Sequence, residues 1–331
     1  MFHYDQDILV HSIGLWLDAG RKKDFSFVSH AHSDHLNRHG RILATPATIA
    51  LGRERERFRR ASSSRGLPRR SPDEMPLEFR APLDLGGATV TLYPAGHVLG
   101  SAQILVECDG HRLLYSGDFC PEATAAAEGI EIPRADTLIM ECTYGLPGHR
   151  FPPRESVVAD LCNFVEKALA RKTTPVCLAY ALGKGQEVMR ILSESGFAVA
   201  AEAETWQLSR VYDSFGVHFN RCRLLDGPPK AKEAVVTPSL ARVAEFLGRR
   251  RVRTAAVTGW ASGGFSYRAA SADVRIPLSD HADFDGLMRY VEAVSPEKVY
   301  IVHGPAEFAW YLKKAGFPVA PITERTPVVS R

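Results

Sequence analysis

Short apolar runs separated by turn residues dominate the first third of the chain. Strand-like runs occupy residues 8–18, 25–29, 88–94, 102–108 and 111–116. Gly20 and the charged stretch RKKD separate the first two runs, and Asp109-Gly110 supplies a hairpin turn between the last two. Apolar and β-branched residues bounded by such turn signals are typical of strands. The pattern therefore predicts a β-rich layer in this part of the chain.

The pattern changes after residue 145, where helix-like and strand-like segments alternate. Helix-like segments cover residues 155–171, 185–195 and a stretch that begins at 204, and strand-like segments cover 175–180 and FAVAA. Alternation of this kind predicts parallel βαβ units. We therefore expect this middle region to be an α/β domain.

Strand-like segments return near residue 254 as TAAVTGW, RIPLS and KVYIVHG, with a helix-like segment at 284–294. A chain of 331 residues exceeds the usual size of one hydrophobic core. We expect one domain made of residues 1–145 and 255–331, with a second domain inserted at 146–254.

The composition places the chain in a broad class. With 45% hydrophobic and 24% charged residues it is typical of a soluble globular protein. No apolar run approaches the roughly 18 residues of a membrane span, and the N-terminus lacks the features of a signal peptide. The six cysteines form no CxxC pair, which favours reduced thiols over a disulfide framework. We expect a cytoplasmic protein with no membrane partner.

The net charge is only +3, so affinity for nucleic acid has to come from local clusters of charge. One cluster begins in a predicted helix at 46–60 and contains eight arginines: Arg53, Arg55, Arg57, Arg59, Arg60, Arg65, Arg69 and Arg70. The candidates for contacts with substrate phosphates are Arg57, Arg59 and Arg60. The alternative is a solvated helix face in which Glu54 and Glu56 pair with neighbouring arginines.

Candidate chemistry is concentrated in FVSHAHSDH, residues 27–35, at the end of an apolar run. So many polar side chains at a strand end are costly unless they bind something. His30 and His32 are two residues apart and face one side of an extended loop, while Asp34 and His35 turn toward a neighbouring position. This spacing favours two adjacent transition-metal ions over one.

Further donors follow other strand-like runs. These are His97 in PAGHVLGS, Asp118 in YSGDF and His303 in YIVHG. Glycines beside them let the backbone come close to metal ions or substrate, and strand-end loops carry functional groups on a rigid scaffold. We expect the strand ends to bring these three donors to the first cluster.

The pattern HxHxDH, with a preceding aspartate in LDAG and later GH and GD settings, resembles the metallo-β-lactamase-fold hydrolases. ECTYG at 141–145, SDHAD at 279–283 and VHG at 302–304 resemble the three motifs of the β-CASP nucleases. The runs PAGHVLGSAQ, TYGLP, TGWA and LSDHADFDGL look most like the bacterial DNA-ligase-associated exonucleases. The resemblance implies an αββα sandwich with an inserted β-CASP α/β domain.

The resemblance also implies roles for individual residues. One zinc ion would be held by His30, His32 and His97, and a second by Asp34, His35 and His303. Asp118 would bridge the two ions, and Mn²⁺ could replace zinc. Asp18 would orient ligands without binding metal. Asp34, Glu141 and His281 are the implied catalytic residues, with Glu141 holding a protonated His281 beside the scissile phosphate.

These roles predict a two-metal phosphodiesterase. A metal-activated hydroxide would attack phosphorus, and His281 would donate a proton to the leaving oxygen. The resemblance favours a DNA exonuclease that acts from the 5′ end in DNA repair, with a DNA ligase and a helicase as partners by family analogy.

Two alternatives stay open. His303 occupies a position where RNA-cleaving relatives usually carry histidine and Artemis-like DNA enzymes carry valine, so RNA processing is the first alternative. Hydrolysis of small molecules on the same fold is the second, but it would need neither the long insertion nor the pair of Glu141 and His281.

The inserted region offers one further candidate, Lys184 in CLAYALGKGQEV. A strand leads through glycines into a helix whose free N–H groups suit a phosphate, and Lys184 would add positive charge. The segment is not a P-loop, because the spacing differs and no Ser or Thr follows the lysine. The alternative is an ordinary βα turn with a solvated lysine.

Overall fold

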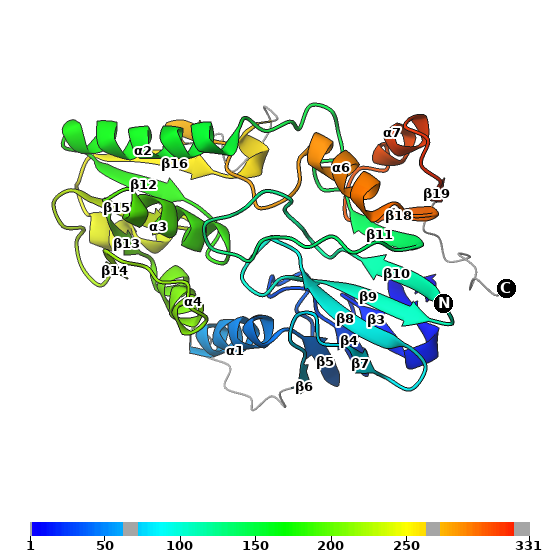
Figure 1. Cartoon of the computed structure of the whole chain (residues 1–331). Coiled ribbons are helices and arrows are strands. Elements are labelled where there is room, and N and C mark those ends of the chain that lie inside the picture. Colours follow the sequence, from blue (N-terminus) through cyan, green and yellow to red (C-terminus); the bar gives the residue numbers. More distant parts are fainter. Residues whose placement is uncertain (1, 62–71, 263–271, 321–331) are drawn as a thin grey trace. The chain divides into compact units, whose positions relative to one another are not determined.

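The structure is a computed structural model that describes residues 2–61, 72–262 and 272–320. The chain forms two compact units (Figure 1). Unit 1 contains Met1–Ala123, Ala127–Pro147 and His281–Arg331, and unit 2 contains Thr124–Ala126 and Gly148–Asp280. Within the described ranges, no helix has both the length and the hydropathy needed to cross a membrane.

Unit 1 is built on two sheets. The first contains, in spatial order, β1 (Phe2–Asp5), β2 (Asp7–Val10), β3 (Leu15–Leu17), β4 (Phe25–Phe27), β5 (Arg41–Ala44) and β6 (Asp73–Pro76). The second contains β19 (Val319–Ala320), β18 (Lys298–Val302), β11 (Thr137–Glu141), β10 (His111–Tyr115), β9 (Ala102–Cys108), β8 (Thr89–Pro94) and β7 (Leu83–Asp84). β8 and β10 both pair antiparallel with β9, and β10, β11 and β18 are parallel to one another. The strands β8, β10, β11 and β18 therefore end at the same edge of the sheet.

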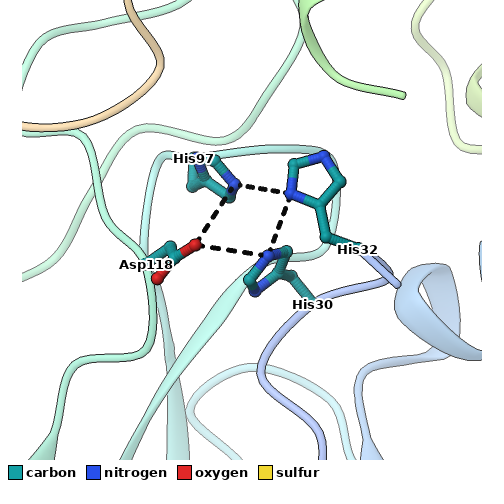
Figure 2. A group of neighbouring side chains, drawn as sticks. All are labelled: His30, His32, His97 and Asp118. Carbon is teal, nitrogen blue, oxygen red and sulfur yellow. Dashed lines mark hydrogen bonds and ion pairs between the residues drawn. The ribbon is translucent and has the colours of Figure 1, made fainter. Parts of the chain in front are cut away.

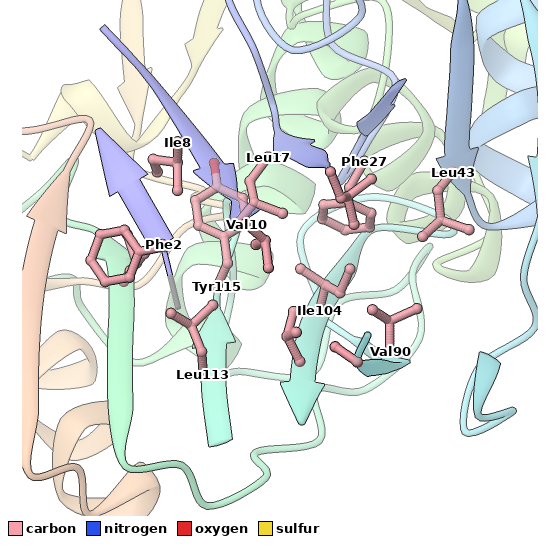
Figure 3. Close-up of a cluster of buried hydrophobic side chains, with 14 of the residues drawn as sticks. Phe2, Ile8, Val10, Leu17, Phe27, Leu43, Val90, Ile104, Leu113 and Tyr115 are labelled. Atoms are coloured by element: carbon pink, nitrogen blue, oxygen red, sulfur yellow. The ribbon is translucent and has the colours of Figure 1, made fainter. Parts of the chain in front are cut away.

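The second sheet presents apolar side chains on both faces in strict alternation. In β10, Leu113 and Tyr115 belong to the core between the two sheets, whereas Leu114 faces the opposite side. Figure 3 shows side chains from both sheets pointing toward one another, among them Phe27 of β4 and Ile104 of β9. Because successive strand residues point to opposite faces, an unbroken apolar run means that both faces are covered.

Helices provide that cover. The helical segments of unit 1 are η1 (His11–Ile13), α1 (Pro46–Ala61), α6 (Phe284–Val294) and α7 (Phe308–Lys314). Ile49 of α1 packs with Ile42 on the outer face of the first sheet. Leu287 of α6 and Leu312 of α7 pack with Leu114 on the outer face of the second. The order helix, sheet, sheet, helix confirms the predicted αββα sandwich.

Unit 2 is a parallel α/β unit. Its sheet contains, in spatial order, β14 (Cys222–Leu224), β13 (Ala198–Ala201), β15 (Glu233–Thr237), β12 (Thr174–Leu178), β16 (Val252–Val257) and β17 (Val274–Ile276). Its helical segments are α2 (Arg154–Ala170), α3 (Lys184–Glu194), α4 (Ala203–Ser214), η2 (Leu240–Arg242), α5 (Ala244–Leu247) and η3 (Gly259–Ala261). All the strand pairs are parallel, as the alternation of helix-like and strand-like segments predicted.

The extent of the inserted domain needs a correction. The sequence pattern assigned the strands near 254 and 274 to the terminal domain, from residue 255 onward. In the structure β16 pairs with β12, and β17 pairs with β16, so both belong to the sheet of unit 2. Unit 2 therefore extends to Asp280. Backbone partners far away in the chain decide which sheet a strand joins, and the hydrophobic pattern of the strand itself does not contain that information.

The apolar run at 8–18 also differs from its prediction as a single strand. It forms β2 and β3, which are antiparallel and separated by η1. Gly14 ends η1 with a left-handed backbone, φ 61°. Glycine adopts this conformation without steric cost, so it allows the chain to reverse inside a run that looks continuous.

Candidate metal centre and catalytic site

The predicted site residues of unit 1 lie in loops at strand ends. β4 precedes His30, His32, Asp34 and His35, β8 precedes His97, β10 precedes Asp118, β11 ends at Glu141, and β18 precedes His303. Because β8, β10, β11 and β18 end at one edge of their sheet, residues far apart in sequence meet there. Asp18 and His281 belong to the same unit.

Four of these side chains form a tight group (Figure 2). His32 Nδ1 lies 3.0 Å from His30 Nε2 and 3.1 Å from His97 Nε2. Asp118 Oδ2 lies 3.5 Å from His30 Nε2 and 4.0 Å from His97 Nε2. His30, His97 and Asp118 are buried, and His32 is partly buried. Three imidazoles and one carboxylate therefore converge on a single point.

One proton on His32 cannot serve both of its imidazole neighbours. Ser29 Oγ donates to Asp18 Oδ2 over 2.6 Å, so it accepts from His30 Nδ1 at 2.9 Å. The other ring nitrogen of His30 then faces the group as a lone pair. Burial and the neighbouring imidazoles hold the pKa of His30 well below its usual value, so the ring is neutral. His32 Nδ1 can donate to one neighbour, but both His30 Nε2 and His97 Nε2 lie within hydrogen-bond distance of it.

A zinc ion fits this donor set. Four donors arranged tetrahedrally at about 2.0 to 2.1 Å from zinc are separated from one another by about 3.3 Å. The donor atoms of His30, His32, His97 and Asp118 all lie within 4.8 Å of one another. Burial, opposed in part by His35, raises the pKa of Asp118 to about 6. An ionised carboxylate here therefore favours a cation beside it.

A second group of donors also includes a contact with Asp118. His35 Nε2 is 3.6 Å from Asp118 Oδ2 and 3.8 Å from Asp34 Oδ2. The ring centroids of His35 and His303 are 5.4 Å apart. Burial opposes charge on His35, but Asp18 and Asp118 raise its pKa to about 10. Surroundings that attract a proton this strongly also attract a metal cation.

Asp18 accepts several hydrogen bonds that hold the loop of donors in place. Its carboxylate accepts from the Ser29 N–H at 2.7 Å, from Ser29 Oγ at 2.6 Å, from His35 Nδ1 at 2.9 Å and from Tyr115 Oη at 3.0 Å. Burial opposes its charge, but His35 and Ser29 keep the pKa of Asp18 below its usual value. Sequence analysis singled out Asp18 and missed Ser29 and Tyr115, since neither residue type signals a role and Tyr115 is 97 residues away.

The backbone is constrained at several of these positions. Asp18 and His303 have left-handed backbones, φ 42° and φ 51°, which non-glycine residues seldom adopt. Gly117 also has positive φ, and a Cβ atom there would lie 2.6 Å from Ser29 Cβ. A Cβ atom on Gly96 would lie 2.3 Å from the Cys120 carbonyl oxygen. These glycines, which precede Asp118 and His97, allow close packing of neighbouring loops.

Glu141 is fully buried and accepts hydrogen bonds at both carboxylate oxygens. Oε1 accepts from the Phe119 N–H at 2.9 Å and lies 2.9 Å from His281 Nδ1. Oε2 accepts from the Thr143 hydroxyl. Burial opposes its charge, but His281 and these hydrogen bonds lower the pKa of Glu141. A carboxylate that stays ionised fixes the Nδ1 proton on His281 and the orientation of its ring.

His281 lies beside the group of donors. Its ring centroid is 4.5 Å from that of His97 and 6.0 Å from that of Tyr144. Its side chain is 18% exposed, whereas that of Glu141 is 1% exposed. The arrangement can therefore present one imidazole, oriented from behind by a buried carboxylate, to a substrate at the donor cluster.

The arginines of α1 are largely paired within the protein. Arg55 donates to the Ala31 carbonyl inside the donor loop, and Arg53 pairs with Glu74. Ion pairs also join Arg60 to Glu56 at 3.0 Å and Arg57 to Glu54 at 3.7 Å. Arg57 and Arg59 are exposed. Arg65, Arg69 and Arg70 lie outside the described residues. These pairs match the solvated-face alternative, and phosphate contacts by Arg57, Arg59 and Arg60 remain predictions.

Lys184 needs a correction. Its side chain is 2% exposed, and its ammonium nitrogen lies 3.0 Å from Asp280 Oδ1 and 3.7 Å from Glu187 Oε2. A lysine buried among carboxylates is not presented to a polymer phosphate, and it is not the solvated lysine of the alternative either. The local sequence did not reveal this, because Asp280 is distant in the chain.

Comparison with known proteins adds an independent line of evidence. A family model described as a Zn-dependent metallo-hydrolase RNA specificity domain matches residues 272–320, a segment that contains His281 and His303. A protein of Opitutus terrae named "Probable DNA ligase" is 39% identical over 326 residues, which is 97% of this chain and 31% of that protein. This chain therefore spans about a third of the length of that relative.

Two eukaryotic relatives match shorter segments. "Endoribonuclease YSH1" of Eremothecium gossypii is 35% identical over 120 residues, 36% of this chain and 15% of that protein. "Cleavage and polyadenylation specificity factor subunit 3" of Dictyostelium discoideum is 34% identical over the same number of residues, 120, with the same shares of the two chains, 36% and 15%. Together with the αββα sandwich and its motifs, these matches support the assignment of the chain to the metallo-β-lactamase-fold β-CASP nuclease family.

Proposed function

We propose that this protein is a metal-dependent phosphodiesterase that hydrolyses nucleic acid. The observation that carries the proposal is the convergence of His30, His32, His97 and Asp118 on one point beside the pair formed by Glu141 and His281. A single cluster of donors would suit many metal-dependent hydrolyses. The oriented imidazole beside it suits a reaction whose leaving group needs a proton, as the alkoxide of a phosphodiester does.

The donors divide into two sets in this proposal. His30, His32 and His97 would hold one zinc ion, Asp34, His35 and His303 would hold a second, and Asp118 would serve both. When bound, zinc ions acidify water near neutral pH and stabilise negative charge on phosphate oxygens. Mn²⁺, which accepts the same imidazole and carboxylate ligands, is proposed as a substitute.

The residues of the chain have separate tasks. Asp18 accepts a hydrogen bond from Nδ1 of His35 and so keeps a proton on that nitrogen. The other ring nitrogen of His35, Nε2, is then directed at the carboxylates of Asp34 and Asp118. Glu141 fixes the tautomer of His281 in the same way. His281 then donates a proton to the oxygen that leaves phosphorus, so that a neutral alcohol departs.

DNA is the polymer we propose first, with exonuclease action from the 5′ end in DNA repair. The relative named "Probable DNA ligase" supports this assignment, because it contains a segment similar to 97% of this chain. The match covers 31% of that relative, so in it the matching segment is joined to further polypeptide. We therefore propose a DNA ligase as a partner, and a helicase by analogy with the family.

RNA is the second candidate, and two observations favour it. The family model that matches residues 272–320 is described as an RNA specificity domain. The two eukaryotic relatives are named as an endoribonuclease and as a subunit of a cleavage and polyadenylation specificity factor. His303, which the first alternative singled out, lies within the matched segment.

One assay separates these possibilities. Purified protein loaded with Zn²⁺ or Mn²⁺ is offered single-stranded DNA, duplex DNA and RNA of matched sequence, each labelled in turn at the 5′ and at the 3′ end. We expect DNA to be degraded from its 5′ end, with mononucleotides or short oligonucleotides released first from that end. Preferential cleavage of RNA would transfer the proposal to the second candidate.

The control for this assay is the same preparation stripped of metal by a chelator and then reloaded. We expect activity to disappear on stripping and to return on reloading with Zn²⁺ or Mn²⁺. Activity that survives complete removal of metal would contradict the proposed function for either polymer.

A further inference from the structure

Unit 2 contains a buried network of four charged side chains. Arg154, the first residue of α2, pairs with Glu187 of α3. Lys184, the first residue of α3, lies 3.7 Å from Glu187 Oε2 and 3.0 Å from Asp280 Oδ1. The side chains of Lys184 and Glu187 are 2% and 3% exposed. Two cations and two anions therefore balance in a space from which water is largely excluded.

The cost of such a network calls for an explanation. Burying ions is unfavourable unless each is paired, and well-packed apolar residues often serve stability equally well. The start of α3 does not depend on Lys184 for its hydrogen bonds. Gln186 accepts from the Gly183 N–H at 2.7 Å, and its amide donates to the carbonyls of Ala181 and Thr205 at 2.9 and 3.0 Å. The ammonium group of Lys184 is therefore not needed to begin α3.

The network holds two consecutive residues of one segment. Lys184 pairs with the carboxylate of Asp280, and Arg154 Nη1 donates to the Ser279 carbonyl oxygen at 3.1 Å. The residue that follows Asp280 in the chain is His281. The pairing of Arg154 with Glu187 would by itself join α2 to α3, so the contacts to Ser279 and Asp280 extend the network to this segment.

The chain is also fixed on the other side of His281. The Ala282 N–H donates to the Phe119 carbonyl oxygen at 2.9 Å. Asp283 caps α6 by accepting from the Gly286 N–H at 2.7 Å. His281 therefore lies between two anchored pairs of residues, and its own ring is held by Glu141.

We propose that Lys184 and Arg154 are positioning residues for His281. The inference rests on the proposed function, in which His281 is the proton donor. By fixing Ser279 and Asp280, the network restrains the backbone immediately before His281. A displacement of a catalytic group by about 1 Å can cost about 10²-fold in rate. This assigns a task to the GKGQE segment other than the binding of substrate phosphate.

The test compares two leaving groups in the metal-loaded full chain. A polynucleotide expels an alkoxide that needs a proton, whereas a 4-nitrophenyl ester of a thymidine phosphate expels a phenolate that leaves without one. For Lys184→Met we expect kcat on the polynucleotide to fall by about 10²-fold, with KM and metal content unchanged. The rate on the 4-nitrophenyl ester should stay at the wild-type level.

Two further variants keep the test decisive. Lys184→Met leaves two carboxylates facing one cation, and the protein could fail to fold. The double variant Lys184→Met with Glu187→Gln restores the balance of charge without restoring the ion pair to Asp280, so it should fold and show the same selective loss. Glu233→Gln is the matched control, because Glu233 is a buried acceptor for Arg223 in the same unit, at 2.8 Å, away from Ser279 and Asp280. It should lower the melting temperature and leave kcat on the polynucleotide unchanged.

The results distinguish a failure of the positioning role from a failure of the proposed function. Equal losses on both substrates, or no loss on the polynucleotide in the double variant, would overturn the positioning role. A wild-type protein that is inert toward polynucleotides and the 4-nitrophenyl ester alike would refute the proposed function itself, and the positioning role with it.

Discussion

The two units each bury a cluster of polar side chains, and the clusters differ in what they lack. In unit 1, His30, His32 and His97 direct ring nitrogens at one point next to a carboxylate, and one proton on His32 cannot serve both of its imidazole neighbours. In unit 2, Lys184 and its partners balance two positive and two negative charges. The first cluster is completed by adding a cation, whereas each charged side chain of the second already lies beside one of opposite charge.

The difference shows how a buried polar cluster indicates its task. A group of lone pairs without matching protons is stable only when a metal ion or a ligand supplies positive charge. A network whose charges are paired needs no ligand to offset them, and the role proposed for it is to fix a conformation. Substitutions that disturb one cluster should therefore change metal binding, and those that disturb the other should change geometry.

The largest effect is expected from His97→Ala, which removes one of the converging donors. We expect loss of at least one metal ion per protein and a fall in nuclease activity of more than about 100-fold. Removing only a hydrogen-bond partner of a metal ligand typically lowers activity by about 10 to 100-fold, and removing the ligand itself should cost more. Metal content by mass spectrometry and end-labelled substrate give the two readouts. His111→Ala is the control, since His111 is a partly buried histidine of the same unit that contacts Thr137. Full metal content in His97→Ala would contradict the interpretation of His30, His32, His97 and Asp118 as metal donors.

His281→Ala should separate the proton donor from the metal donors. We expect metal content to stay at the wild-type level and kcat to fall by about 10² to 10⁴-fold, the usual contribution of general acid catalysis. Its ring lies next to that of His97, so the distinction has to be measured. A variant depleted of metal would show that His281 belongs to the donor cluster.

Asp18→Asn should weaken the donor cluster without removing a donor. Asparagine has nearly the same size and tolerates the left-handed backbone of this position, φ 42°. It carries no charge to stabilise His35, so we expect metal affinity to fall by about 10 to 100-fold, measured by competition with a chelator. Asp136→Asn is the control, because Asp136 accepts from the Arg112 N–H in the same unit but does not contact the donors. Equal affinity in the two variants would contradict the role of Asp18.

The sequence predicted much of unit 1, for a physical reason. Apolar runs that end in His or Asp marked the strand ends, and parallel strands such as β10, β11 and β18 bring their ends to one edge. The motif pattern alone therefore indicated the donors. The prediction did not include β1, β5, β6, β7, β11, β14, β15 or β19, since short strands such as TLIME at 137–141 carry few turn signals.

The rest depended on contacts between distant residues. β16 and β17 looked like strands of the terminal domain until their pairing with β12 assigned them to unit 2. Lys184 looked like a phosphate ligand because Asp280, its partner, lies far along the chain. Ser29 and Tyr115 carried no signal, because serine and tyrosine are common in strands and their hydrogen bonds to Asp18 exist only in the folded protein.

Tyr115→Phe should give the smallest effect and the finest test of the comparison. The hydroxyl is one of several donors to Asp18, and Ser29 and His35 retain their hydrogen bonds when it is removed. We expect the metal-free protein to lose about 1 kcal/mol of unfolding free energy, the usual value of a buried hydrogen bond. Because Asp18 then orients His35 less firmly, metal affinity should fall by less than it does in Asp18→Asn, when both are measured by competition with the same chelator. Tyr290→Phe removes another buried hydroxyl of unit 1, which donates to Gln103, and should destabilise the protein similarly without changing metal affinity. If both variants lowered metal affinity equally, the contribution of Tyr115 would be general stability, and the donor cluster would not depend on the hydrogen bonds behind it.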